Sequence, residues 1–248
     1  DLSLPLLPIP ASLQIEWDPA GPPATPAAQA HIDARWNDYL SQATAHNKSL
    51  FDGRITRLIS CRIDKPGTLH LCLGPATYKS FLVTRLRDRA WFEENAPDAM
   101  VLALGNSALL THGHEALLGL RSENVSAYAG RLHLFGGVLE ELATPKFPAS
   151  PEGIIAHLRL ELSEEVRIHA ADLAPAPRVL GTAHDNHLGQ PELFWQWETT
   201  VPLLQLAARL DAHEHTGTTV ITKGKISAET LAQMTPVARE AYRRWSQL

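Results

Sequence analysis

The chain has 248 residues, of which 44% are hydrophobic and 20% are charged, and its formal net charge is −5. This composition is ordinary for a soluble globular protein, and no apolar run approaches the roughly 18 residues that a membrane helix needs. An acidic chain without a basic stripe also argues against nucleic acid as a partner, and an anionic ligand would need a metal ion to screen its charge.

The two cysteines, Cys61 and Cys72, form no CxxC pair, and the opening "DLSLPLLPIPAS" lacks the basic stretch of a signal peptide. We therefore expect two reduced thiols and a cytoplasmic protein. The composition predicts no membrane partner, and it leaves the oligomeric state open.

The first part of the chain predicts a small α+β region. Seven prolines in residues 1–26 favour an extended arm or edge, and the apolar spacing predicts a helix from Ala27 to about His46. The segments "ITRLISCRI" and "TLHLCLG" alternate like the two strands of a hairpin, with "KPG" as the turn. Helical spacing returns in "ATYKSFLVTRLRDRAWFEENA", and "APD" ends it. We place a domain boundary here, dividing 1–98 from 99–248.

The second part mixes strands and helices. Strands are expected at 101–104, 108–111 and 116–120, followed by the strand-like "RLHLF", a Gly136-Gly137 pair and an irregular insertion. A helix should run from Pro151 to about Arg167. After it we expect strands in "RVLGTAHD" and "ELFWQWETTV", a short helix in "PLLQLAARL", a strand in "GTTVIT" and closing helices. Elements in this order predict an α/β fold with a mixed sheet between helices.

The helix around "LRLELSEEVRI" carries three carboxylates, Glu161, Glu164 and Glu165. Ser150-Pro151-Glu152 is a good helix start, and at 100° per residue Glu165 falls inside the apolar stripe with the other two beside it. A solvated acidic face is the ordinary interpretation of such a run. However, a carboxylate in low dielectric beside like charges is costly to ionise unless a cation binds there, and carboxylate oxygens suit Mg²⁺.

This pattern resembles the Nudix box, Gx5Ex7REUxEExGU with U a bulky aliphatic residue. Glu152, seven intervening residues and then Leu160 to Ile168 place all four box glutamates at the right spacing, behind the strand and glycine pair of "LHLFGG". The chain departs from the box where Leu160 replaces the arginine and Arg167 replaces the glycine. The spacer after Gly137 is also about nine residues too long. In the family, the arginine helps to hold a glutamate in place.

Short patches in order along the chain resemble the UDP-glucose and UDP-galactose pyrophosphatase branch of this family: "LFDG", "LGPATYKSFLVT", "FGG", the long insertion and "HEHTGTTVI". The resemblance implies an α/β/α Nudix sandwich with a mixed sheet, preceded by a small N-terminal α+β unit. It also implies Mg²⁺-dependent hydrolysis of a nucleotide sugar to UMP and a sugar 1-phosphate, with Mn²⁺ as an alternative ion. The metal would screen the diphosphate and activate the attacking water.

The resemblance assigns the site residues as follows. The metal ligands would be Glu161, Glu164 and Glu165, with a backbone carbonyl from Gly136 or Gly137. The catalytic acids would be Glu161, Glu165 and Glu214, although Glu214 is equally a solvated loop carboxylate. The branch-level patches add Phe51, Tyr78 and Thr84 as contacts for the uracil, although aromatic residues at helical spacing are more often core residues.

Other chemistries have weaker support. Histidines pair up at His112/His114, His184/His187 and His213/His215, but each pair falls on a predicted turn and no cysteine joins it, which disfavours a zinc site. The chain has neither a GxSxG elbow nor a GxxxxGK[ST] loop. Two alternatives to the UDP-sugar hydrolase remain open: a Nudix pyrophosphatase for another substrate such as ADP-ribose, and a module that binds nucleotide sugars with little or no cleavage.

Overall fold

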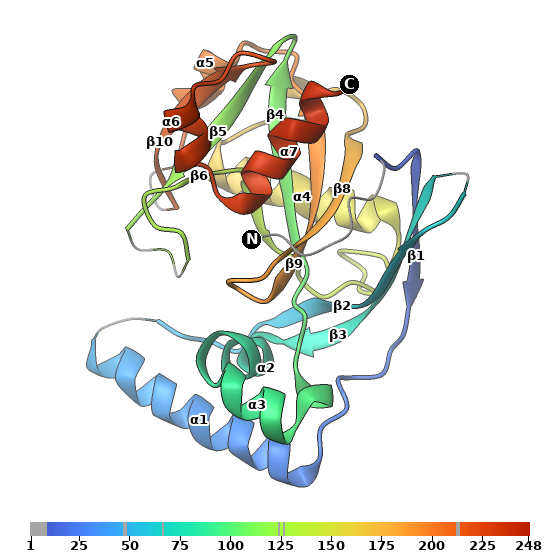
Figure 1. Cartoon of the computed structure of the whole chain (residues 1–248), viewed down its shortest axis with the longest axis vertical. Coiled ribbons are helices and arrows are strands. Elements are labelled where there is room, and N and C mark those ends of the chain that lie inside the picture. Colours follow the sequence, from blue (N-terminus) through green and yellow to red (C-terminus); the bar gives the residue numbers. More distant parts are fainter. Residues whose placement is uncertain (1–8, 47–48, 66, 124, 126, 212–213) are drawn as a thin grey trace.

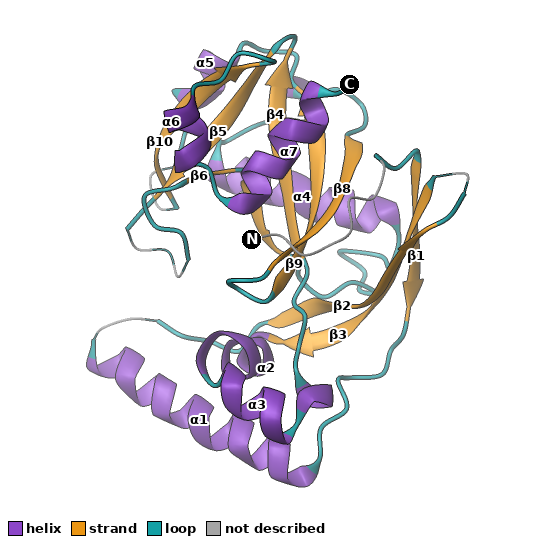
Figure 2. Cartoon of the chain, in the orientation of Figure 1, coloured by secondary structure: helices purple, strands orange, loops and turns teal. Residues whose placement is uncertain are grey.

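A computed structural model of the chain describes residues 9–46, 49–65, 67–123, 125, 127–211 and 214–248. The first eight residues of the proline-rich arm lie outside the described residues. The remainder forms an α/β fold with two mixed sheets and helices, which confirms the expected fold class. Figure 2 shows how the strands of the larger sheet run between helices.

The N-terminal part contains a three-stranded sheet in the order β1-β3-β2, with β1 parallel to β3 and β2 antiparallel to it. Its elements are β1 (Ser12–Trp17), α1 (Pro26–Ala45), β2 (Arg54–Ile63), β3 (Thr68–Thr77), α2 (Tyr78–Phe81), a π-helical stretch (Leu82–Arg87), α3 (Arg89–Asn95) and a 3-10 turn (Pro97–Ala99).

The larger sheet runs β10-β5-β4-β9-β8, with β6 paired to β5 and β7 paired to β4. Only the β4–β9 pair is parallel among the described pairings of this sheet. Its strands and the surrounding helices are β4 (Gly105–His112), β5 (Glu115–Arg121), β6 (Leu132–His133), β7 (Phe135–Val138), α4 (Pro151–Glu165), a 3-10 turn (Ala170–Asp172), β8 (Arg178–Asp185), β9 (Gln190–Glu198), α5 (Leu203–Ala207), β10 (His215–Thr222), α6 (Ala228–Gln233) and α7 (Pro236–Ser246).

Helices cover both faces of the larger sheet, with α7 in front of it and α4 behind it in the view of Figure 1. Successive residues of a strand point to opposite faces, so Leu110 belongs to the core cluster that includes Leu158 and Leu162 of α4. Leu109 belongs instead to the cluster that includes Trp245 of α7. The sheet is therefore the middle layer of a sandwich.

The small sheet packs on the α4 side of this sandwich. Leu71 and Leu73 of β3 lie in the same core cluster as the apolar residues of α4, while Ile32 and Trp36 of α1 form a separate cluster with Phe92 of α3. Helices α1, α2 and α3 gather beyond β2 and β3, away from the larger sheet (Figure 1). The division of the chain at residue 98 stays a prediction.

Two expected elements were wrong in detail. The predicted helix after Ala76 is broken at Asp88, whose backbone (φ −112°, ψ 30°) leaves the helical region while its carboxylate binds Arg35 and Tyr39 of α1. Residues 101–104 do not form a strand of the larger sheet. They run beside β2 instead, where the Leu58 N–H donates to the Leu102 carbonyl oxygen. Both errors arise from contacts with elements that are distant in the sequence.

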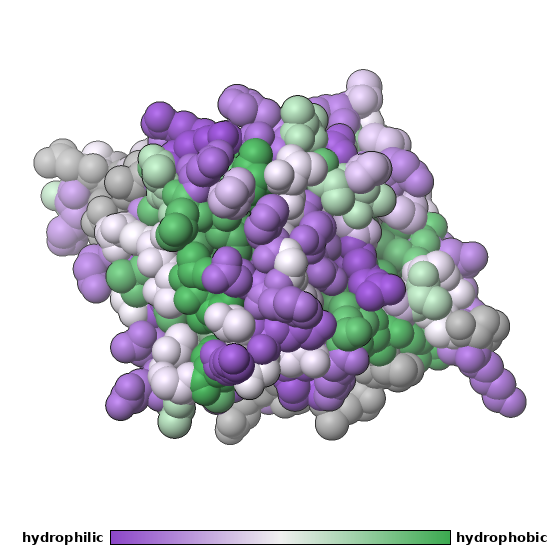
Figure 3. Space-filling model, turned by 90° about the horizontal axis from the view of Figure 1, so that it is seen from above, coloured by the Kyte–Doolittle hydropathy of each residue, from purple (hydrophilic) through white to green (hydrophobic). Residues whose placement is uncertain are grey.

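No helix among the described residues is both long and apolar enough to cross a membrane. On the face seen in Figure 3, hydrophobic residues gather in bands that hydrophilic residues separate.

Candidate active site

Two consecutive glycines, Gly136 and Gly137 in β7, bring the backbone close to β4 and α4. Gly136 has a φ of +133°, and a Cβ atom added there would collide with the carbonyl oxygen of Asn106. A Cβ atom added at Gly137 would lie 2.9 Å from Oε2 of Glu161. Gly136 must therefore be glycine for β4 and β7 to approach so closely, whereas a side chain at Gly137 would displace the Glu161 carboxylate.

Helix α4 presents two glutamates to this glycine pair. The Ser150 hydroxyl accepts a hydrogen bond from the Gly153 N–H and caps the helix, with Pro151 in its first turn. Leu158 and Leu162 are fully buried, which sets the rotation of the helix. The adjoining side carries Glu161 and Glu165 toward β7. The periodicity argument, which placed Glu165 within the apolar stripe, agrees with its exposed fraction of 5%.

Glu165 is a buried carboxylate with only part of its hydrogen-bonding capacity used. The Gly136 N–H donates to its Oε2 atom at 3.0 Å, while its Oε1 atom is buried and has no hydrogen-bond partner among the described residues. Burial raises the pKa of Glu165 well above its usual value. The nearby charges of Glu214 and Glu161 raise this pKa further, against the lowering effects of Gly136 and Arg121.

A buried histidine also faces Glu165. His215 of β10 is 1% exposed, and its Nε2 atom lies 3.3 Å from Oε2 of Glu165. Burial, together with the charge of Arg121, lowers the pKa of His215 to about 4, so its ring is neutral at pH 7. A neutral ring cannot compensate the charge of an ionised Glu165. Among the described residues, no lysine or arginine forms an ion pair with Glu165, and only the charge of Arg121 lowers its pKa from a distance.

The residues at this place fit a hard divalent cation. The described residues contain no preassembled group of three or more His, Cys, Asp or Glu side chains around a metal position, which gives no support to a zinc cage. Mg²⁺ does not need such a cage, since it is usually held by one or two carboxylates together with waters and substrate phosphates. Glu161, and Glu165 with a buried oxygen that has no partner among the described residues, provide carboxylate oxygens of this kind beside the backbone of the glycine pair.

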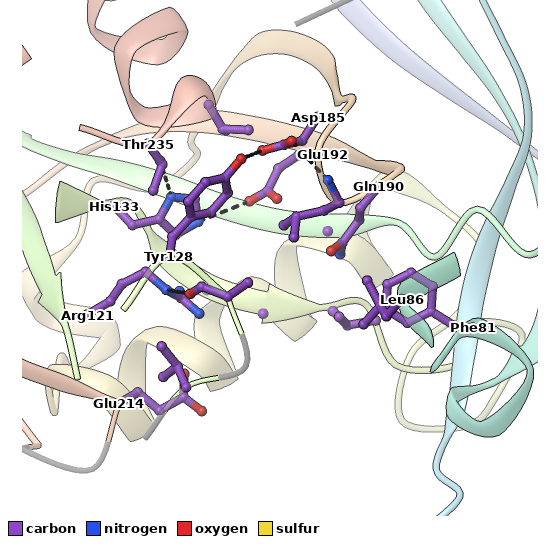
Figure 4. Close-up of a pocket in the computed structure, with 18 of the residues that line it drawn as sticks. Phe81, Leu86, Arg121, Tyr128, His133, Asp185, Gln190, Glu192, Glu214 and Thr235 are labelled. Carbon is purple, nitrogen blue, oxygen red and sulfur yellow. Dashed lines mark hydrogen bonds and ion pairs between the residues drawn. The ribbon is translucent and has the colours of Figure 1, made fainter. Parts of the chain in front are cut away.

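A cavity of about 340 Å³ opens over the glycine pair, at the end of the sheet where β5 and β8 end and β9 begins. Figure 4 shows polar side chains on one wall and the apolar Phe81 and Leu86 opposite them. Its volume lies within the usual range for small-molecule sites. The polar wall comes from several strands and connections, and it includes Arg121, Tyr128, His133, Asp185, Gln190 and Glu192.

The polar wall contains a carboxyl group with a raised pKa and two side chains that hydrogen bonds hold in place. Burial raises the pKa of Glu192 to about 7, so this group is protonated about half of the time near neutral pH. The Tyr128 hydroxyl donates to Asp185 at 2.6 Å, and Tyr128 has a φ of +54°, which is rare for a residue with a side chain. The Arg121 Nε–H donates to the Ala127 carbonyl oxygen at 2.9 Å, which holds a guanidinium group at the pocket.

The structure brings some of the expected catalytic and metal residues together and separates others. Glu161, Glu165 and Gly137 lie side by side, and Glu214 lines the cavity close enough to raise the pKa of Glu165. Glu164 lies on the exposed side of α4. The roles of all five residues stay predictions.

The three expected uracil contacts have different positions. Tyr78 lines the cavity and also a neighbouring groove, whereas Phe51, which is 76% exposed, lines only that groove. Thr84 was wrong as a substrate contact, because it is fully buried and its hydroxyl accepts a hydrogen bond from the Val101 N–H at 3.1 Å. Thr84 joins the π-helical stretch to the segment that leads into β4, and helical spacing alone does not reveal such a role.

Several residues of the site were not singled out as site residues from the sequence. His215 was assigned to a turn, yet it lies buried in β10, and a Cβ atom on Gly119 would collide with its ring. The partner position His213 is outside the described residues. Arg121, Tyr128 and Glu192 carry no local signal, since only the pairing of distant strands brings them to one cavity.

No family model matches this sequence, and no curated protein matches it. Among solved structures, a MutT NUDIX hydrolase from Burkholderia pseudomallei is 16% identical, with 57% of this chain and 96% of that chain covered at a TM-score of 0.40. A NUDIX hydrolase from Nitrosomonas europaea is 15% identical, with coverages of 58% and 88% and a TM-score of 0.42.

A third similar structure is a bifunctional NMN adenylyltransferase/ADP ribose pyrophosphatase from Francisella tularensis, complexed with AMP and a Mn ion. It is 14% identical, with 62% of this chain and 42% of that chain covered at a TM-score of 0.41. These likenesses are of low identity and cover part of the chain. The residues of the site therefore have to support any function on their own.

Proposed function

We propose that the protein is a Nudix-type diphosphatase that hydrolyses a nucleoside diphosphate sugar with the help of Mg²⁺ or Mn²⁺. The observation that supports this function is the placement of Glu165. Its carboxylate is buried beside Glu161 and near Glu214, and one of its oxygens has no partner within the part of the chain that the structure describes. Glu161 and Glu165 both face the glycine pair, which lines the cavity. A cation shared with a diphosphate would make this arrangement favourable.

The residues of the chain would divide the work as follows. The Gly136 N–H orients Glu165, and Glu161 and Glu165 would hold the cation together with a carbonyl of the glycine pair. When bound, the cation supplies charge neutralisation of the diphosphate and lowers the pKa of water. Arg121 provides a positive charge for phosphate oxygens at the same cavity. Glu214 remains the candidate for orienting the attacking water, since it lines the cavity beside these residues.

UDP-glucose and UDP-galactose are the substrates that we propose first, since the sequence patches that resemble that branch include Tyr78 at the cavity wall. ADP-ribose is the alternative within the same class. The acidic and hydrogen-bonding wall formed by Asp185, Gln190 and Glu192 suits the hydroxyl groups of a sugar or ribose in either case. We also propose that the enzyme acts in the cytoplasm, in agreement with the free thiols of Cys61 and Cys72.

A second function of another class is a nucleotide-sugar-binding module without turnover. Leu160 favours it, because this residue occupies the position of the arginine that holds a glutamate in the resembling family. Such a module would keep the cavity and its affinity for the nucleotide sugar but would hydrolyse it slowly or not at all.

Incubation with Mg²⁺ and a panel of UDP-glucose, UDP-galactose, ADP-ribose and ADP-glucose tests these functions. Release of UMP and sugar 1-phosphate from the UDP-sugars alone supports the leading proposal, and release of AMP from ADP-ribose supports the alternative. Calorimetric binding of a UDP-sugar without any product would support the binding module. If the protein neither binds nor cleaves any member of the panel, the proposed function is refuted.

A further inference from the structure

His157 lies in α4, one helical turn before Glu161, in the interior of the protein. Its side chain is fully buried, and its ring meets the ring of Phe147 edge-on at a centroid distance of 5.4 Å. A buried imidazole needs partners for both of its nitrogen atoms, and burial without such partners is costly. The partners of His157 therefore indicate what this residue does.

One nitrogen is held by a chain of hydrogen bonds that starts on β9. The Trp195 Nε1–H donates to Oδ1 of Asn106 at 2.9 Å, which orients the Asn106 amide. Its Nδ2 group then donates to the Ile154 carbonyl oxygen at 3.1 Å and lies 3.4 Å from Nδ1 of His157. Because the Asn106 amide nitrogen can only donate, Nδ1 must be the acceptor, and the proton of a neutral ring is on Nε2.

The other nitrogen faces the carboxylate ladder. Nε2 of His157 lies 3.2 Å from Oε1 of Glu161, and it has no aligned hydrogen bond to any described residue. Oε2 of Glu161 is the oxygen that faces Gly137. No lysine or arginine of the described residues forms an ion pair with Glu161. The imidazole is thus the group that can direct one oxygen of this carboxylate and leave the other for the glycine pair.

We propose that His157, with its tautomer set by Asn106, is a positioning residue that fixes the orientation of Glu161 for cation binding. This inference rests on the proposed function. In the resembling family an arginine helps to hold a glutamate in place, and Leu160, which stands at that position here, has no polar group for this role; the inference assigns the role to His157. The arrangement parallels the general need of ligating carboxylates for hydrogen-bonded support, whose loss typically costs 10- to 100-fold in metal affinity or activity.

The first test uses two variants of the full chain, His157→Leu and His157→Gln. The leucine removes the N–H that faces Glu161, whereas the glutamine amide can place an N–H near the position of Nε2. Mn²⁺ binding is measured by electron paramagnetic resonance without substrate, and kcat and KM are measured with the nucleotide sugar that the wild type cleaves. We expect His157→Leu to weaken Mn²⁺ binding and to lower kcat by about 10- to 100-fold. His157→Gln should stay within about threefold of the wild type.

The second test needs no core truncation. Nitrogen-15 chemical shifts of His157 in the wild type should report a proton on Nε2. In Asn106→Asp the acceptor carboxylate should draw the proton to Nδ1, and Mn²⁺ binding should weaken as the lone pair of Nε2 then faces Glu161. A proton on Nδ1 in the wild type, wild-type Mn²⁺ affinity in a folded His157→Leu, or equal losses in the leucine and glutamine variants would overturn the inference.

The two levels of the proposal fail differently. A wild-type protein that neither binds Mn²⁺ nor cleaves any diphosphate would refute the proposed function itself, whatever the variants do. A wild type that does both, with variants that behave like it, would refute only the role of His157.

Discussion

Two carboxyl groups with raised pKa values lie at this site: Glu192 in the wall of the cavity, and Glu165 beside the glycine pair that lines it. On the α4 side, Glu165 is raised by burial and then by two like charges, Glu214 and Glu161. On the side of β8 and β9, burial and, to a smaller extent, the charge of Asp185 raise the pKa of Glu192, against the lowering effects of Ser107 and Arg121. Its neighbour His133 is neutral, because burial lowers the pKa of that ring well below its usual value. Two like charges thus raise the pKa of Glu165, whereas one raises that of Glu192.

This difference indicates which side binds a cation. A divalent ion relieves repulsion among several carboxylates, so it stabilises the protein most when it binds beside Glu165 and Glu161. Glu192 gains less from an ion, because one like charge acts on it rather than two, and a carboxyl in a polar wall can take up a proton and act as a hydrogen-bonding group. We therefore expect metal-linked effects from substitutions on the α4 side and proton-linked effects from substitutions on the β9 side.

The largest effect should come from Glu165→Gln. The amide keeps the shape of the side chain but removes the negative charge, so we expect loss of Mn²⁺ binding and a fall in kcat of about 10²- to 10³-fold. The fold should remain intact, and without metal the variant should be more resistant to urea than the wild type at pH 8, because it no longer buries an ionisable group among like charges. Stopped assays with Mg²⁺ and urea unfolding measure the two quantities.

Glu152→Gln is the matched control, since it removes a carboxylate from the exposed first turn of the same helix. Its kcat should stay within about twofold of the wild type, because a solvent-exposed charge at this distance is screened. Full activity in Glu165→Gln would contradict cation binding at this place.

The second largest effect should follow from Gly136→Ala. A methyl group at φ +133° is strained, and it would also collide with the carbonyl of Asn106, so we expect a loss on the order of 3 kcal/mol in the free energy of unfolding. The Gly136 N–H would move away from Glu165, and Mn²⁺ affinity should fall as well. Gly113→Ala provides the control, since Gly113 has a φ of +59° with no atom within 4 Å of the added Cβ. It should lose only about 1 kcal/mol and no Mn²⁺ affinity.

The contrast between the two sides also separates what the sequence predicts from what it does not. Helix α4 is long and periodic, so its start at Ser150 and the burial of Glu165 follow from local spacing. The mixed α/β class was also predicted, because the order of strands and helices is visible along the chain. These features depend on short-range patterns, which a single sequence contains.

The opposite wall depends on long-range pairing. Arg121, Tyr128 and Glu192 reach one cavity only because β5, β8 and β9 lie in one sheet, whose order and register have no local signature. The same limit applies at Thr84, which the branch-level resemblance gave as a uracil contact and which is buried with its hydroxyl bonded to the Val101 N–H. The role of His215 was missed because its strand pairs with β5, and nothing near position 215 indicates that partner.

On the β9 side, Glu192→Gln should change the pH dependence of stability. The pKa of Glu192 is about 7 in the folded state against 4.5 for an unperturbed glutamate, so its contribution is fully present below pH 4.5 and is lost as the pH rises through 7. Relative to the variant, the wild type should lose up to about 3 kcal/mol across that window. Urea unfolding at pH 4.5, 6 and 8 without divalent ions measures this loss.

The control for this prediction has the opposite sign. The Ser150 hydroxyl lowers the pKa of Glu152, so the stability that Glu152 contributes is present at neutral pH and is lost as the pH falls. The difference in free energy of unfolding between the wild type and Glu152→Gln should therefore change with pH in the opposite direction to the difference for Glu192→Gln. If the Glu192→Gln variant and the wild type keep a constant difference from pH 4.5 to 8, Glu192 is ionised in the folded protein and the contrast between the two walls fails.

The smallest effect should come from Tyr128→Phe on the same polar wall. This substitution removes the hydrogen bond to Asp185 but keeps the ring and its unusual backbone conformation, so we expect KM for the nucleotide sugar to rise about two- to fivefold with kcat unchanged. Tyr128→Ala, which also removes the aromatic face, should raise KM about tenfold. Tyr242→Phe on α7 is the control, because its hydroxyl bonds the Thr222 carbonyl oxygen and it does not line the cavity. A fall in kcat or in Mn²⁺ affinity in Tyr128→Phe would mean that this wall takes part in the metal-linked chemistry, and the separation of the two sides would then be wrong.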